Sequence, residues 1–211
     1  MSENLWNWNI DRFLAESASS APTPGGGSVS AYVGALGASM VCMVANLTVG
    51  KEKYKEVEAE VTEILDEAEV CLKELKSGLE KDINVFSKFM DVFKMPKETE
   101  EQKNMRAQSM QEVLREATDS PMEVARKSLL VLQLAQKLAP IGNKGAISDV
   151  GVAAYLAESA MNSAMLSVDI NLPQLKDVSF TSQIRTECSA MKGQAAVILA
   201  DTLKVLKERI V

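Results

Sequence analysis

The chain has 211 residues, of which 46% are hydrophobic and 25% are charged, and its formal net charge is −6. This composition predicts one soluble globular domain over residues 1–211, and the acidic balance argues against a nucleic-acid partner, which needs a basic face. Because the sequence contains no histidine, we exclude catalytic histidines and histidine-ligated zinc, and we expect no metal site.

Three cysteines and the N-terminal segment indicate the cellular compartment of the protein. Cys42, Cys71 and Cys188 lie far apart within apolar helical patterns, so we expect them to be buried, reduced thiols. Residues 1–13 lack the basic region and the apolar run of a signal peptide. We therefore predict a cytoplasmic protein.

The first part of the chain predicts a short helix, a loop and an apolar helix. The short helix covers residues 10–17 and is capped by Asn9. The loop Pro22–Gly27 follows, and its prolines and glycines favour an unusual backbone path. It leads into the apolar helix over residues 28–49, for which Ser28 is the natural N-cap.

The helix over residues 28–49 carries no charge and is near the length of a membrane span, about 20 residues. Polar side chains within it, among them Asn46 and Thr48, argue against insertion, so we expect no membrane association. Its small residues, including Gly34 and Gly37, allow a second helix to approach closely. We expect this helix in the middle of a bundle.

The remaining chain predicts helices only. A single long helix over residues 54–93 has an apolar stripe with steps of three or four residues, and Met95-Pro96 ends it. Four further helices are expected, over residues 99–117, 121–139, from Ser148 or Asp149 to 168, and 181–210. Thr99 and Gln102 form a capping box for the first of them, and Ser120 caps the second. A second glycine loop, Gly142–Gly145, precedes the third.

These elements predict an all-α fold: a single-domain helical bundle with one very long helix and two buried apolar helices, residues 28–49 and 149–168. Both apolar helices lack a polar face. In a chain of this size one of them is expected to face a second subunit, so we predict a homodimer.

Two polar loops, Pro24–Ser28 and Gly142–Asp149, each precede one of the apolar helices. If the two helices are neighbours, unpaired backbone N–H groups at both N-termini meet at one cleft. The alternative is two ordinary capped turns. The first loop lacks the Gly-Lys-Ser/Thr ending of a P-loop, which leaves nucleotide binding as a weak alternative.

Asp82 stands at the edge of the apolar stripe of the long helix, three residues after Leu79 and four before Phe86. Partial burial there raises the pKa of a carboxylate towards the range of proton transfer. An ion pair with a lysine or arginine is the alternative. Lys97 and Arg106 lie in a basic cluster that is either solvated surface or a site for a carboxylate.

Taken together, these motifs resemble the cyclodeaminase/cyclohydrolase family of folate one-carbon enzymes over nearly the whole chain. The residues that carry the resemblance are Pro22-Thr-Pro-Gly-Gly-Gly-Ser28, Met43-Val-Ala-Asn-Leu-Thr-Val-Gly-Lys51, Tyr54, Asp82, Met95-Pro-Lys97, Arg106, Gly142-Asn143, Ser148-Asp149 and Asn171-Leu-Pro173. Ser167-Val168 departs from the pattern, because many relatives have Asn followed by Val before the Asn-Leu segment.

The resemblance implies a homodimeric enzyme that acts on the carbon bridging N5 and N10 of tetrahydrofolate and needs no cofactor. It implies catalytic roles for Asp82 as acid/base, for Lys51 beside it or at an oxyanion, and for Asp149. The substrate-binding residues that it implies are Pro24, Gly25, Gly26, Gly27, Ser28, Asn46, Lys97, Arg106, Gly142, Asn143 and Ser148, with Lys97 and Arg106 at the glutamate tail.

Two reactions fit the resemblance. A methenyltetrahydrofolate cyclohydrolase adds water to the bridging carbon, and a formiminotetrahydrofolate cyclodeaminase releases ammonia from it. The cyclohydrolase is slightly favoured, because no formiminotransferase domain is attached. An alternative from another class is a non-catalytic helical dimer that binds folate or acts as a scaffold.

Overall fold

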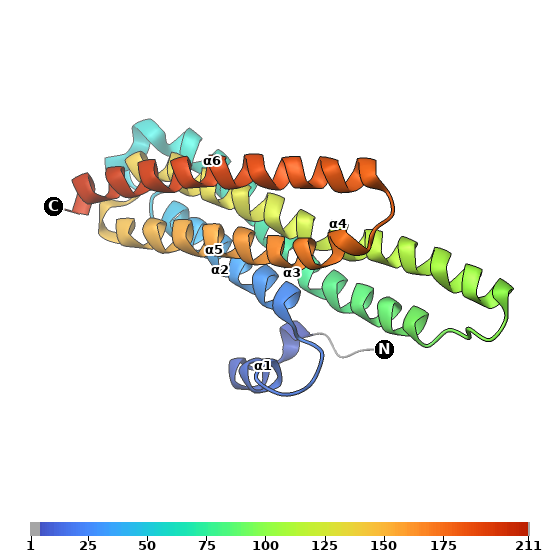
Figure 1. Ribbon diagram of the computed structural model, residues 1–211. Coiled ribbons are helices and arrows are strands. Elements are labelled where there is room, and N and C mark those ends of the chain that lie inside the picture. Colours follow the sequence, from blue (N-terminus) through green and yellow to red (C-terminus); the bar gives the residue numbers. More distant parts are fainter. Residues whose placement is uncertain (1–4, 211) are drawn as a thin grey trace.

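The computed structural model describes residues 5–210, and this part of the chain is helical without a strand, which confirms the all-α prediction (Figure 1). The six α-helices are α1 (Ile10–Ser17), α2 (Gly26–Asn46), α3 (Glu58–Phe93), α4 (Glu100–Ile141), α5 (Ile147–Asn171) and α6 (Val178–Ile210). The short 3-10 helices are η1 (Leu5–Asn7), η2 (Glu52–Val57), η3 (Lys144–Ala146) and η4 (Leu172–Gln174).

Helix α2 is the central helix of the bundle, as the sequence predicts. It packs against α3, α4 and α5, and most of its small residues are buried there. By length and composition alone α2 is also apolar enough to cross a membrane. Its burial among three other helices instead makes it the core helix of this fold.

The helices α3 and α4 form a hairpin whose far end extends beyond the rest of the bundle (Figure 1). Helix α1 is capped by Asn9, whose side chain accepts from the backbone of Arg12, as predicted. It lies against the start of α2, where the rings of Phe13 and Tyr32 stack with centroids 4.8 Å apart.

Helix α4 corrects the prediction of two separate helices, because it runs unbroken for 42 residues through Pro121. Proline lacks the N–H that would bond the carbonyl four residues earlier, here Ala117. The side-chain amide of Asn171 supplies that donor and bonds the Ala117 oxygen at 2.9 Å. The predicted capping box at Thr99 and Gln102 is confirmed, and the bundle has three helices longer than 30 residues rather than one.

Several predicted helix starts are wrong by a few residues. Helix α2 begins after Gly25, so Ser28 lies in its first turn and is not the N-cap. Helix α3 begins at Glu58, because the preceding residues form η2. Helix α5 begins at Ile147 without a side-chain cap from Ser148 or Asp149, and α6 begins at Val178.

The neighbours α2 and α5 run antiparallel and touch closely. A Cβ placed on Gly37 would lie 3.3 Å from backbone atoms of Ala153 and Ala157, and one on Gly34 would lie 3.5 Å from Ala160. Small residues are therefore required where the two helices meet, as the sequence predicts. The antiparallel arrangement places the N-terminus of α2 beside the C-terminus of α5.

Candidate functional site

The carboxylate of Asp82 on α3 lies at the N-terminus of α2. The hydroxyl of Ser28 donates to its Oδ2 atom at 2.7 Å, and the backbone N–H of Ser28 also donates to the carboxylate. The first N–H groups of a helix have no partner within the helix and carry partial positive charge. Asp82 therefore occupies the position of an anion bound at a helix N-terminus.

The glycine before Ser28 is required by this contact. A Cβ placed on Gly27 would lie 2.1 Å from Oδ1 of Asp82 and 2.6 Å from its Cγ, whereas a Cβ on Gly26 would meet no atom within 4 Å. The peptide bond between Thr23 and Pro24 is cis. Of the three glycines in the loop motif, Gly27 is the one that lets the carboxylate reach the backbone.

Burial raises the pKa of Asp82, and the two hydrogen bonds from Ser28 lower it in part. The predicted alternative, an ion pair, is wrong: among the ion pairs of residues 5–210 none includes Asp82, and its neighbour Lys81 pairs with Glu123. A carboxyl group with a raised pKa beside a cavity can exchange protons closer to neutral pH.

A cavity of about 210 Å³ adjoins Asp82 between α3, α4 and α5. Its lining consists of Asp82, Val85, Phe86, Phe89, Ala117, Ser120, Pro121, Ser167, Ile170 and Asn171. Ser167 and Ile170 also line a groove of about 440 Å³ between α2 and α5, so cavity and groove adjoin at these two residues. The space available to a ligand is thus larger than the cavity itself.

Three polar residues of this cavity, Ser120, Ser167 and Asn171, were not among the predicted site residues. Ser120 is 2% exposed, and its hydroxyl has no hydrogen-bond partner in the structure. The amide of Asn171 bonds the carbonyls of Ala117 and Ser167. The sequence signal was the pair of proline motifs, Ser120-Pro121 and Asn171-Leu-Pro, but only the packing of α5 on α4 brings them together.

A second polar cluster lies at the other end of α2. The amide of Asn143 donates to the Leu47 carbonyl at 2.7 Å, and its backbone N–H donates to the Thr48 hydroxyl at 2.9 Å. The backbone of Lys144 donates to the hydroxyl of Tyr54 at 2.9 Å. Along the chain, Gly142 comes directly before Asn143, and Ser148 and Asp149 lie in the first turn of α5. Asn46 and Lys51, on either side of Leu47 and Thr48 in the sequence, are exposed.

The expected single cleft between both helix N-termini is therefore not formed within one chain. Helix α2 spans 21 residues, so Gly26 and Asn46 are about 30 Å apart. Because α5 runs antiparallel to α2, its N-terminus lies near the Asn46 end and not near Asp82. The structure groups Pro24–Ser28 with Asp82, and separately Asn46 and Lys51 with Gly142–Asp149.

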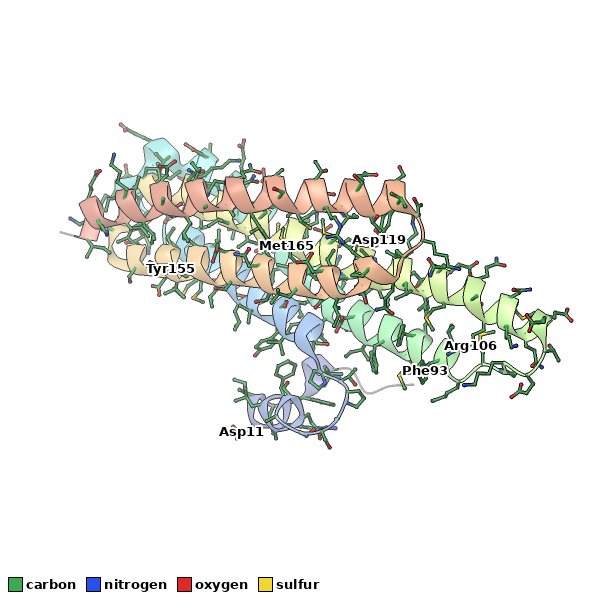
Figure 2. The ribbon with its side chains drawn as sticks, viewed as in Figure 1. Asp11, Phe93, Arg106, Asp119, Tyr155 and Met165 are labelled. Atoms are coloured by element: carbon green, nitrogen blue, oxygen red, sulfur yellow. The ribbon has the colours of Figure 1, made fainter. Side chains whose placement is uncertain are left out.

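The third predicted group lies at the tip of the hairpin, where Figure 2 shows Arg106 beside Phe93. The guanidinium of Arg106 donates to the Phe93 carbonyl at 3.3 Å and lies 5.6 Å from the ring centroid. Phe93 stands eleven residues after Asp82 on α3, about 16 Å further along the helix. Lys97 is exposed in the loop beyond it.

The three cysteines of the chain lie within the core of the bundle. Cys42, Cys71 and Cys188 are free and buried, as predicted. Burial raises the pKa of both Cys42 and Cys71 to about 11, which keeps them as unreactive thiols. Within residues 5–210, no group of three or more His, Cys, Asp or Glu side chains could hold a metal ion.

Comparison with known proteins gives consistent matches over almost the whole chain. A family model described as formiminotransferase-cyclodeaminase matches residues 9–190. A methenyltetrahydrofolate cyclohydrolase from Methylorubrum extorquens is 38% identical over 204 residues, which cover 97% of this chain and 98% of that protein. A formimidoyltransferase-cyclodeaminase from Sus scrofa is 32% identical, but this chain spans only 37% of its length.

A solved structure has the same fold. The crystal structure of formiminotetrahydrofolate cyclodeaminase from Thermotoga maritima superposes with a TM-score of 0.87 at 29% sequence identity. The match covers 98% of this chain and 100% of that one.

Proposed function

Because this chain belongs to the formiminotransferase-cyclodeaminase family, we propose that it is a folate one-carbon enzyme acting on the carbon that bridges N5 and N10 of tetrahydrofolate. The reaction we favour is hydrolysis of 5,10-methenyltetrahydrofolate to 10-formyltetrahydrofolate. Supporting this choice, the cyclohydrolase of Methylorubrum extorquens matches this chain over nearly its full length.

The observation that carries the proposal is the half-buried Asp82 carboxylate beside a cavity. In the proposed reaction Asp82 takes a proton from the water that attacks the bridging carbon. It then gives that proton to N5 as the carbon–N5 bond breaks, and the hydroxyl proton on the bridging carbon leaves to solvent, so that a formyl group remains on N10. A raised pKa suits a group that must accept and release a proton in one turnover.

Other residues of the cavity would position the substrate. Phe86 and Phe89 offer aromatic surface to the rings of a folate. The buried hydroxyl of Ser120 lacks a partner and could bond a polar edge of the pterin after a change of rotamer. Arg106 on α4 lies beside Phe93, the last residue of α3, and Lys97 lies in the loop after it, in the direction that an extended glutamate tail would need.

A cyclodeaminase is the second candidate, favoured by the Thermotoga maritima structure that covers this whole fold. In that reaction N10 attacks the formimino carbon, and Asp82 would protonate the departing ammonia. The absorbance of the methenyl compound separates the two reactions. We expect it to fall when the purified protein receives methenyltetrahydrofolate, whereas a cyclodeaminase raises it from the formimino substrate. Protein that binds folate but leaves both substrates unchanged would instead be the non-catalytic dimer.

We further propose a cytoplasmic homodimer without a resident cofactor. The three buried, free cysteines support a reducing compartment. The dimer is supported by the apolar side chains that α2 and α5 leave exposed. Light scattering should give twice the mass of one chain, and a stable monomer at micromolar concentration would contradict the dimer.

A further inference from the structure

Two polar side chains that line the cavity beside Asp82 have hydrogen-bonding capacity that the fold does not use. They are Ser120 on α4 and Asn171 on α5. The hydroxyl of Ser120 is buried, and within residues 5–210 it has no hydrogen-bond partner. A buried polar group without a partner lowers stability. A molecule bound in the cavity would supply the partner that the chain itself does not.

The amide of Asn171 is held in one orientation. Its Nδ2 atom donates to the carbonyl oxygens of Ala117 and Ser167, each at 2.9 Å, so both of its hydrogens are used. Turning the amide round would place its oxygen against these two carbonyl oxygens, and all three atoms are acceptors. In the described part of the chain no donor bonds the Oδ1 atom of Asn171. This oxygen therefore remains available as an acceptor at the cavity.

The free donor and the free acceptor lie close to the same turn of α4. Ala117, whose carbonyl accepts from Asn171, stands three residues before Ser120, and residues with this spacing are neighbours on the surface of a helix. A hydroxyl and an amide oxygen side by side match a lactam, in which a carbonyl group is bonded to an N–H group. The carbonyl accepts from the hydroxyl, and the N–H donates to the amide oxygen.

The size and lining of the cavity indicate a flat ring as its occupant. Cavities that enclose a whole drug-sized ligand measure about 300–1,000 Å³. A volume of about 210 Å³ therefore holds only one part of a folate. Phe86 and Phe89 follow Asp82 on α3 by four and seven residues, so their rings lie on the same side of the helix as the carboxylate. This aromatic surface suits a bicyclic ring better than a charged, flexible glutamate tail.

We propose that Ser120 and Asn171 determine specificity by binding the lactam edge of the pterin ring. The Ser120 hydroxyl donates to O4, the oxygen on C4, and Oδ1 of Asn171 accepts the hydrogen of N3. The inference rests on the proposed folate activity, because it assigns the ring of that substrate to this cavity. In a pterin, N5 is bonded to the carbon next to C4, so O4 and N5 point to the same side. Holding O4 at Ser120 therefore brings N5 to the side of the cavity where Asp82 can protonate it.

Titration calorimetry with pterin and with 2,4-diaminopteridine tests the acceptor at Asn171 without any change to the protein. The second compound has the same ring system, but an amino group replaces O4 and N3 carries no hydrogen. N3 and the Oδ1 atom of Asn171 would then be two acceptors in contact. We expect the diamino compound to bind roughly 10–10²-fold more weakly than pterin. Equal affinities would overturn the proposed recognition of the lactam edge.

Ser120→Ala tests the donor, and here a binding role and a structural role predict opposite changes in stability. Because the hydroxyl has no partner, its removal should raise the melting temperature of the ligand-free protein by about 2–4 °C. The Kd for pterin and the KM for methenyltetrahydrofolate should each rise about 10-fold, with a smaller change in kcat. A hydroxyl that only stabilises the fold would instead give a lower melting temperature and an unchanged Kd.

Ser128→Ala is the matched control. Ser128 lies eight residues further along α4, and it too is buried with a hydroxyl that has no partner within residues 5–210, but it does not line the cavity. Its replacement should raise the melting temperature and leave the Kd for pterin unchanged. If Ser120→Ala keeps the wild-type Kd and KM, or if the wild type does not bind pterin, the ring site is overturned while the folate reaction can still stand. If the wild type binds pterin, Ser120→Ala weakens that binding and methenyltetrahydrofolate stays unchanged, the ring site is supported and only the folate reaction is rejected.

Discussion

Replacing Gly27 by alanine tests whether the position of the Asp82 carboxylate controls the reaction. The new Cβ would lie 2.1 Å from Oδ1 and 2.9 Å from Oδ2 of Asp82, where ordinary contact begins at 3.4 Å. The carboxylate must therefore move by about 1 Å or lose its bonds to Ser28. A displacement of this size at a reacting group costs on the order of 10²-fold in rate.

The assay is the fall in methenyltetrahydrofolate absorbance, measured with the melting temperature of the same sample. We expect Gly27→Ala to lower kcat about 10²-fold while the protein stays folded. Gly193→Ala on α6 is the matched control, because a Cβ there meets no atom within 4 Å. It should leave kcat unchanged and stabilise the helix by about 0.5–1 kcal/mol. Equal kcat values for Gly27→Ala and wild type would refute the role of this contact.

The remaining predictions concern charge, packing and metal. Asp82→Asn should lower kcat roughly 10²–10⁴-fold. Burial raises the pKa of Asp82. The free energy of unfolding of the wild type should therefore fall relative to that of Asp82→Asn as pH rises from about 4 through the raised pKa. If urea unfolding gives the same pH dependence of this free energy for both proteins, the pKa of Asp82 is not raised. Gly34→Ala places a Cβ 2.9 Å from Ser128 Oγ and should destabilise the fold by about 1–3 kcal/mol, seen as a lower melting temperature. Asn171→Ala leaves the Ala117 carbonyl without its donor and should cost about 1–3 kcal/mol in urea unfolding. Activity should survive prolonged chelation, and its loss with EDTA and recovery with zinc would point to a metal.

The amino-acid sequence by itself determined the helical class, most of the helices and the burial of α2. The reason is local: apolar residues with a period near 3.6, the Asn9 cap and the Thr99 capping box all act within a few residues of chain. It also identified Asp82 and Gly25–Ser28 as candidate site residues. A carboxylate beside an apolar stripe and a run of glycines can both be recognised in the sequence without knowing the tertiary contacts.

Local signals failed where a distant residue changes the outcome. Ser120-Pro121 has the pattern of a helix start, yet α4 continues through it because Asn171, 50 residues later, bonds the freed carbonyl. Likewise Ser28 has the pattern of a cap, but its hydroxyl donates to Asp82 on another helix. In both cases the residue that decides the outcome, Asn171 or Asp82, lies 50 or more residues away along the chain, so the sequence near the serine does not reveal it.

Only the tertiary structure decided how the predicted site residues are grouped. Both polar loops precede buried helices, but the antiparallel packing of α2 and α5 sends their N-termini to opposite ends of the bundle. The direction of two neighbouring helices depends on how loops and side chains of the whole chain pack, which local propensity does not encode. The sequence therefore identified the residues, while the fold divided them between the Asp82 cavity, the Asn143 loop and the hairpin tip.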